Sequence, residues 1–159
     1  MRPDNERLSK LRFLARVVER ESRHLAQTDA RLFSEPFTES RVRALEGDVE
    51  LAERVEAFVG RYGRLQDTLA DKLLPALLTA LGETTGAVLD NLDRAERLGW
   101  LESADDWMAA RQLRNRMIHE YVEDPAVFAD ALQEAHGFCA LLQQTAARML
   151  DEMRRRSWN

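Results

Sequence analysis

Apolar residues recur at every third or fourth position along almost the whole chain, and this spacing limits the fold more than any other feature. No sustained two-residue alternation, the mark of half-buried strands, accompanies it. Only four prolines and seven glycines occur among the 159 residues, so long helices meet few breaking residues. The pattern predicts an all-α protein. We expect an antiparallel helical bundle of four to five helices that forms a single domain over residues 1–159.

Capping residues and turn signals place the expected helices along the chain. The expected helices cover residues 5–27, 48–75, 84–98, 103–121 and 125–156, with a short helix between 38 and 47. Asp48 and the pair Asp124-Pro125 are typical helix starts, and Gly99 is typical of a helix end. Pro75 is expected to kink or end the second long helix. Arg154-Arg155-Arg156 suits the negative end of the last helix dipole better than a nucleic-acid arm.

Composition excludes several classes of function. Apolar residues at 45% and charged residues at 32% are typical of an ordinary globular protein. The net charge of −5 argues against broad adhesion to nucleic acid, so any contact with RNA or DNA must be local. No apolar run approaches the ~18 residues of a membrane span, and the charged opening lacks a signal-peptide core, so we expect no membrane contact and a cytoplasmic location.

Cysteine and histidine usage gives no sign of a metal centre. Cys139 is the single cysteine, so no internal disulfide can form. Paired Cys/His spacings of the kind that hold zinc do not occur in the sequence. We therefore expect neither a metal nor a cofactor.

The fourth expected helix carries an arginine where apolar residues gather. On a helical wheel its apolar positions share one sector: Trp107, Ala110, Leu113, Met117, Ile118 and Tyr121. Arg114 falls inside that sector. Because a buried, unpaired guanidinium is very costly, Arg114 must meet a carboxylate from a neighbouring helix or face a wet cleft. Asp67 and Asp71 are the candidate partners.

A polar strip lies beside this sector and consists of Arg111, Gln112, Asn115 and His119. Asn115 and His119 are only about 40° apart on the wheel, so they can share a small site. Arg114 and His119 are about 140° apart. Either the arginine side chain wraps around the helix, the helix is distorted, or a second subunit completes the pocket.

Each residue also has a purely structural interpretation. His119, beside Glu120 and Glu123, fits an exposed residue with a weak ion pair. Arg114 fits a buried structural ion pair, and Tyr121 fits a core aromatic with a hydrogen-bonded hydroxyl. Only their joint occurrence favours a functional site.

Arg114-Asn115-x-x-x-His119-x-Tyr121 resembles the Arg-Asn-x-x-x-His signature of the HEPN superfamily, in the extended form that ends in tyrosine and typifies the HepT toxins. Two further segments are similar to the HepT-like pattern: Arg61-Tyr62-Gly63-Arg64-Leu65-Gln66-Asp67, and Leu98-Gly99-Trp100-Leu101 followed by Trp107. The resemblance covers roughly residues 5–149. The segment from 38 to 47 offers nothing distinctive to match.

The resemblance implies a metal-independent ribonuclease toxin that is encoded with a minimal nucleotidyltransferase antitoxin, which transfers AMP to the motif tyrosine. It assigns catalysis to Arg114, Asn115 and His119, AMP acceptance to Tyr121, and RNA contacts to Arg111 and Arg116. The residue types suit the chemistry. An imidazole with a reference pKa near ~6.5 can move protons at neutral pH, and a guanidinium matches phosphate oxygens. AMP on the tyrosine would place a phosphate beside Arg114 and block RNA.

Two other functions stay open at this point. One is a non-catalytic HEPN accessory subunit that binds a nucleotidyltransferase or its nucleotide. The other is a helical scaffold whose polar strip is only surface. The family also implies a homodimer, in which two motif helices meeting across a two-fold axis would gather Arg111, Arg114 and Arg116 of each chain in one groove.

Overall fold

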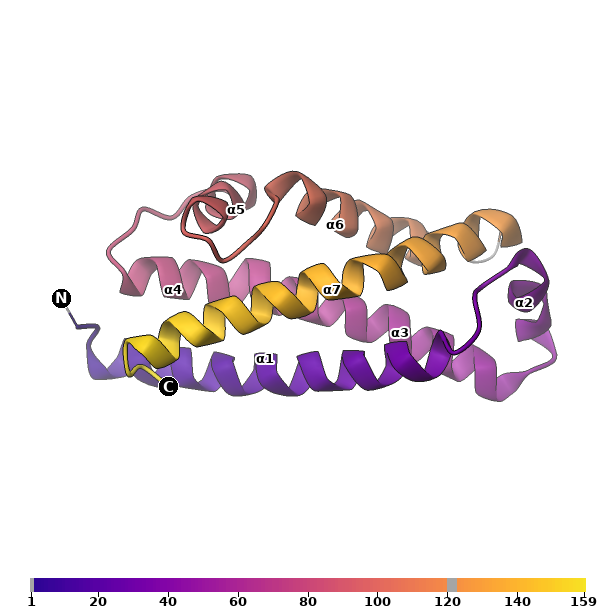
Figure 1. The fold of residues 1–159 in the computed structure, drawn as a ribbon, viewed down its shortest axis with the longest axis horizontal. Coiled ribbons are helices and arrows are strands. Elements are labelled where there is room, and N and C mark those ends of the chain that lie inside the picture. Colours follow the sequence, from indigo (N-terminus) through magenta and orange to yellow (C-terminus); the bar gives the residue numbers. More distant parts are fainter. Residues whose placement is uncertain (1, 120–122) are drawn as a thin grey trace.

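Long helices run alternately in opposite directions along the computed structural model, which describes residues 2–119 and 123–159 (Figure 1). The long elements are α1 (Asn5–Leu32), the continuous run of α3 (Val49–Asp67), the π-helical segment η2 (Thr68–Leu73) and α4 (Leu74–Ala80), and then α6 (Ala104–His119) and α7 (Pro125–Arg155). Shorter helices, α2 (Glu39–Arg43) with the 3₁₀ turn η1 (Ala44–Glu46) and α5 (Val88–Arg97), complete the helical bundle. The described residues contain no strand, so the prediction of an all-α protein is confirmed.

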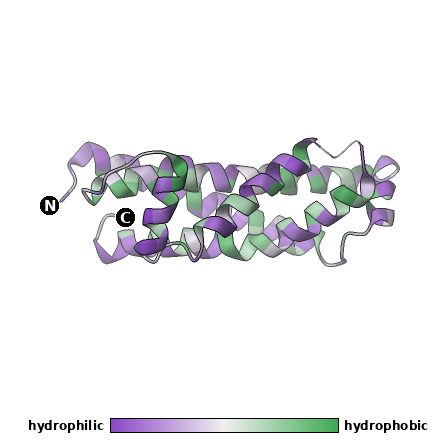
Figure 2. Ribbon diagram, turned by 90° about the horizontal axis from the view of Figure 1, so that it is seen from above, coloured by the Kyte–Doolittle hydropathy of each residue, from purple (hydrophilic) through white to green (hydrophobic). Residues whose placement is uncertain are grey.

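One continuous core joins the long helices. Apolar residues at helical spacing form buried stripes on three of these helices: Leu8, Leu11, Leu14, Val18 and Leu25 on α1, Leu51, Val55, Phe58, Tyr62 and Leu65 on α3, and Phe128, Leu132, Ala135, Cys139, Leu142, Ala146, Leu150 and Met153 on α7. Figure 2 shows the corresponding alternation of hydrophobic and hydrophilic positions along each helix. The largest fully buried side chains include Trp107, Tyr62, Phe58 and Phe128. Among the described helices, none combines the length and the apolar character needed to span a bilayer.

The predicted helix starts are confirmed by their hydrogen bonds. The Asp48 carboxylate accepts from the Leu51 amide at 3.0 Å, which satisfies one of the free donors in the first turn of α3. The Asp124 carboxylate does the same for two amides at the start of α7. Thr38 caps α2. Gly99, which follows α5, has a φ of 82°, the left-handed conformation that glycine adopts without strain.

Two predicted boundaries are wrong. The first helix continues to Leu32 instead of ending near residue 27. The third predicted helix, 84–98, begins only at Val88. The Asn91 side chain explains this late start, because its amide binds both backbone groups of Gly86, accepting from N–H at 2.9 Å and donating to C=O at 3.2 Å. These bonds hold the preceding chain in a non-helical turn.

Pro75 does not end the second long helix. The backbone widens into a π-helical segment, η2 (Thr68–Leu73), and then continues as α4 through the proline. The Leu74 amide donates to the Leu69 carbonyl, five residues earlier. Since proline has no N–H, the usual bond to residue 71 is absent in any case. The helix therefore passes the proline by loosening one turn before it.

Candidate functional site

The Arg114 guanidinium of α6 forms an ion pair with Asp67 at the end of α3. The Arg114 Nη1 atom donates to the Asp67 Oδ1 atom at 2.5 Å. The side chains are 28% and 39% exposed, so the pair lies at the edge of the helix interface and water reaches it. Of the two predicted alternatives, a carboxylate partner or a wet cleft, the carboxylate partner is present, and Asp67 supplies it.

Gly63 provides the space in which Arg114 lies. A Cβ atom at this position would lie 2.7 Å from the Arg114 Nε atom and 3.2 Å from Cδ and Cζ. The guanidinium therefore rests directly on the α3 backbone, one turn before Asp67. Glycine in a helix interior costs about 1 kcal/mol relative to alanine. A glycine at position 63 of a predicted helix was therefore the one sequence signal that another group packs closely against the backbone there.

Tyr62 of α3 holds α6, the motif helix, through a hydrogen bond in the core. Its fully buried hydroxyl donates to the Ala110 carbonyl of α6 at 3.0 Å. Burial raises the pKa of Tyr62 well above its usual range, so the hydroxyl remains a proton donor at every physiological pH. One hydrogen bond in the core and one ion pair at the edge thus join the same two helices.

A groove of about 460 Å³ opens beside Arg114. Its walls come from α3, the last turns of α6 and the start of α7, and most of its lining is apolar. The lining residues are Val55, Glu56, Val59, Gly60, Gly63, Arg64, Arg114, Met117, Ile118 and Phe128. Ile118 is 52% exposed at this groove, although it falls in the apolar sector of the helical wheel. It belongs to the last turn of α6, at the rim of the packed interface.

The other two arginines of α6, Arg111 and Arg116, also lie near carboxylates, but on different neighbouring elements. The Arg111 guanidinium lies 3.9 Å from Asp71 of η2, on the side where Arg114 meets Asp67. Arg116 lies 3.8 Å from Glu134 of α7. Within one protomer, Arg111 and Arg114 therefore share a face and Arg116 does not. Pairs as exposed as these contribute little to stability.

Asn115 and His119 are both exposed, as expected for the polar strip. Among the described residues, no hydrogen bond or ion pair joins His119 to Arg114. Tyr121, the predicted AMP acceptor, lies outside the described residues. In the described part of the chain, no group of three or more His, Cys, Asp and Glu side chains is arranged to hold a metal ion.

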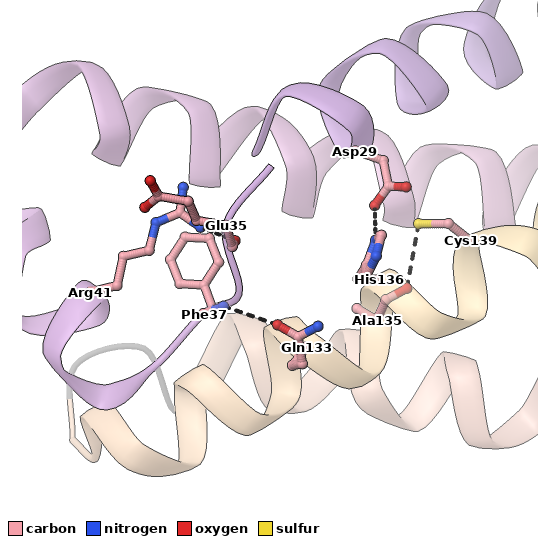
Figure 3. Close-up of polar contacts among 8 residues, drawn as sticks. All are labelled: Asp29, Glu35, Phe37, Arg41, Gln133, Ala135, His136 and Cys139. Atoms are coloured by element: carbon pink, nitrogen blue, oxygen red, sulfur yellow. Dashed lines mark hydrogen bonds and ion pairs between the residues drawn. The ribbon is translucent and has the colours of Figure 1, made fainter. Parts of the chain in front are cut away.

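A second polar cluster, at the far end of α1, was not predicted (Figure 3). His136 of α7 meets Asp29 of α1 through its Nδ1 atom at 2.7 Å and stacks on Phe33 with ring centroids 4.3 Å apart. The Phe37 amide donates to the Gln133 side chain at 2.9 Å. These contacts hold the α1–α2 connection against α7. Isolated histidine, aspartate and glutamine positions in the sequence gave no signal that they would meet.

Cys139 lies next to this cluster and is inert by its surroundings. Its thiol donates to the Ala135 carbonyl at 3.4 Å within α7 (Figure 3). Burial and the nearby Asp29 carboxylate raise the pKa of the Cys139 thiol well above its usual range. Because the thiolate is the reactive form, this cysteine serves packing.

Comparison with known proteins does not identify the chain: no family model, curated protein or solved structure matches it. The likeness to HEPN proteins rests on the spacing of Arg114, Asn115, His119 and Tyr121. Function is therefore inferred from that spacing and from the geometry around Arg114.

The two glycines of α3 offer a matched test of this geometry. We expect Gly60→Ala to stabilise the protein by about 0.5–1 kcal/mol, because alanine favours helix and the nearest atom, on Arg64, lies at an ordinary 3.7 Å. Gly63→Ala should lose that gain, because its Cβ displaces Arg114 from Asp67. Urea unfolding followed by circular dichroism measures both. Equal stabilisation by the two substitutions would show that Arg114 does not depend on Gly63.

Proposed function

We propose that this protein is a metal-independent endoribonuclease of the HepT-like HEPN type, acting as the toxin of a toxin–antitoxin system. One observation carries the proposal. Arg114 is fixed by Asp67 and Gly63 at an open groove, while Asn115, the next residue, and His119, at the end of the same helix, are exposed. A cation, an amide and an imidazole thus come from one short segment of α6.

These groups suit cleavage of RNA by its own 2′-hydroxyl. His119 removes the 2′ proton, the 2′ oxygen forms a bond to phosphorus, and the bond to the 5′ oxygen breaks. The leaving 5′ oxygen takes a proton from water, and the protonated His119 returns its proton to the hydroxide that forms. Negative charge grows on the non-bridging oxygens during this step, and Arg114 faces them with its planar fork of donors. Asn115 orients the phosphate or the imidazole. Asp67 acts on Arg114 and does not touch the substrate.

Arg114 can keep Asp67 while it binds a phosphate. A guanidinium has five N–H donors, and in the described part of the chain one of its nitrogens bonds Asp67. An ion pair that is about one third exposed contributes roughly 0–1 kcal/mol, so sharing the guanidinium between Asp67 and a phosphate costs little stability. The carboxylate fixes the direction of the guanidinium, and Arg114 lines the groove where the phosphate would bind.

The proposed enzyme is a homodimer whose sites combine residues of two protomers. Arg114 points to α3, whereas His119 is exposed at the end of α6, about 140° away around an ideal helix. A two-fold axis near the end of α6 would bring the arginine of one protomer to the histidine of the other. The exposed Ile118 supplies apolar surface for such a contact.

The proposed regulation is transfer of AMP to Tyr121 by a minimal nucleotidyltransferase antitoxin. Tyr121 follows His119 by two residues, so an attached phosphate would carry negative charge to the place where the RNA phosphate is needed. Repulsion and occupancy together would stop RNA binding.

His119→Ala should abolish cleavage of single-stranded RNA, because no other group of the site moves protons near neutral pH. Cleavage by the parent should persist in EDTA. Gln112→Ala, an exposed substitution on the same strip, should cleave normally, and both variants should keep the helical circular-dichroism spectrum. Full activity of the His119 variant would refute the nuclease. A parent protein that binds nucleotide but leaves RNA uncut would instead identify the non-catalytic accessory subunit.

Mixing two inactive variants tests the shared site. After subunit exchange between Arg114→Ala and His119→Ala proteins, half of the dimers are mixed and one site in each mixed dimer is intact, so we expect about one quarter of the parental rate. Sites built within one protomer would give no recovery. RNA cleavage in the mixture distinguishes these outcomes, and sedimentation velocity checks that the dimer forms.

Tyr121→Phe should escape neutralisation, because the variant lacks the hydroxyl that would receive AMP. The cognate nucleotidyltransferase with ATP should add AMP to the parent and silence its RNA cleavage, while the variant stays active and unmodified in intact-mass spectra. Equal AMP addition to the variant would assign the acceptor to another residue.

A further inference from the structure

A second groove, of about 490 Å³, lies between the first turns of α1 and the segment formed by η2 and α4. We call it the lysine groove. Its floor is apolar, with Leu14 of α1 and Pro75 and Ala76 of α4. Its rim is formed by Arg7, Lys10, Asp71, Lys72 and Thr79. A hydrophobic floor with a mostly cationic rim suits a ligand that alternates apolar and anionic groups.

Both lysines of the chain lie on this rim, and every other Lys/Arg position in the sequence is arginine. Lys10 and Lys72 are exposed, and neither forms an ion pair with a described residue. The rim thus holds three cations and one carboxylate, Asp71, and of the three cations Arg7 lies 3.9 Å from a second carboxylate, that of Asp4. Glu21 of α1 interacts electrostatically with Lys72 at longer range. In a chain of net charge −5, this excess of positive charge is local.

Asp71 connects the lysine groove with the motif helix. Its carboxylate lines the groove and also lies 3.9 Å from the Arg111 guanidinium of α6. Arg111 thereby neutralises the one acid on the rim. Arg114 follows one turn later on α6 and faces the same side, towards Asp67. From Arg111 to His119 the helix rises by about 12 Å, so a strand leaving the groove reaches the proposed catalytic residues within a few nucleotides.

We propose that the lysine groove binds the sugar-phosphate backbone of an RNA strand next to the cleaved phosphate. Phosphates lie at Lys10 and Lys72, and riboses pack on Leu14 and Pro75. An ammonium is a compact charge on a flexible stem, which tolerates different phosphate positions. Backbone contacts of this kind give affinity and orientation without reading the base sequence. The identity of the strand as RNA rests on the proposed function.

The double variant Lys10→Gln/Lys72→Gln tests this site. The probe is a fluorescent, 2′-O-methylated single-stranded RNA, which lacks the free 2′-hydroxyl and cannot be cut. Fluorescence anisotropy over a range of salt concentrations should show Kd raised about tenfold or more, and the slope of log Kd against log salt lowered by about 1.4, because two phosphate contacts are lost. Cleavage of unmodified RNA should show a raised KM with kcat unchanged.

The matched control, Arg31→Gln/Arg43→Gln, removes two charges from exposed positions at the opposite end of α1 and on α2. It should bind within about twofold of the parent, since its charges lie more than a Debye length from the groove. Parental affinity and slope in the lysine variant would overturn the proposal, and so would an equal loss in the control. Failure of the proposed function looks different: the parent would bind the probe, with the lysine dependence intact, but leave unmodified RNA uncut.

Discussion

The ion pair between Arg114 and Asp67 is the constraint on which the site depends. A guanidinium placed between two packed helices needs both a carboxylate and room. Asp67 supplies the first, and the missing Cβ of Gly63 supplies the second. Together with the buried bond from Tyr62 to α6, they fix the rotation of the motif helix. That rotation decides which side chains of α6 meet α3 and which remain in solvent.

Much of the fold was predictable, because it follows from local rules and from periodicity. The buried stripes of α1, α3 and α7 and the caps at Asp48 and Asp124 are as the sequence indicated. The late start of α5 was not predictable by those rules, because it depends on a side-chain bond between Asn91 and Gly86 that competes with the helix. The cluster of Asp29 and His136 needed contacts across 107 positions.

The need for a partner to Arg114 was predictable from the sequence, but the choice of partner was not. A helical wheel shows that Arg114 falls among apolar residues, and electrostatics then demands a partner such as Asp67 or Asp71. The wheel cannot show that the two aspartates divide the work, one pairing with Arg114 and the other with Arg111. It also groups the exposed Ile118 with buried residues such as Met117, since a wheel carries no information about where the neighbouring helix surface ends.

Pro75 connects the backbone geometry with the placement of charge. Because proline offers no N–H, the turn before it has no reason to keep regular α-helical bonding, and the chain takes the wider π-helical form from Thr68 to Leu73. Asp71 and Lys72 both lie in that turn. Asp71 meets Arg111 while it lines the lysine groove, and Lys72 stands beside it on the rim. The missing amide hydrogen of Pro75 thus favours the wider turn that carries Asp71 and Lys72, two residues that line the lysine groove next to α6.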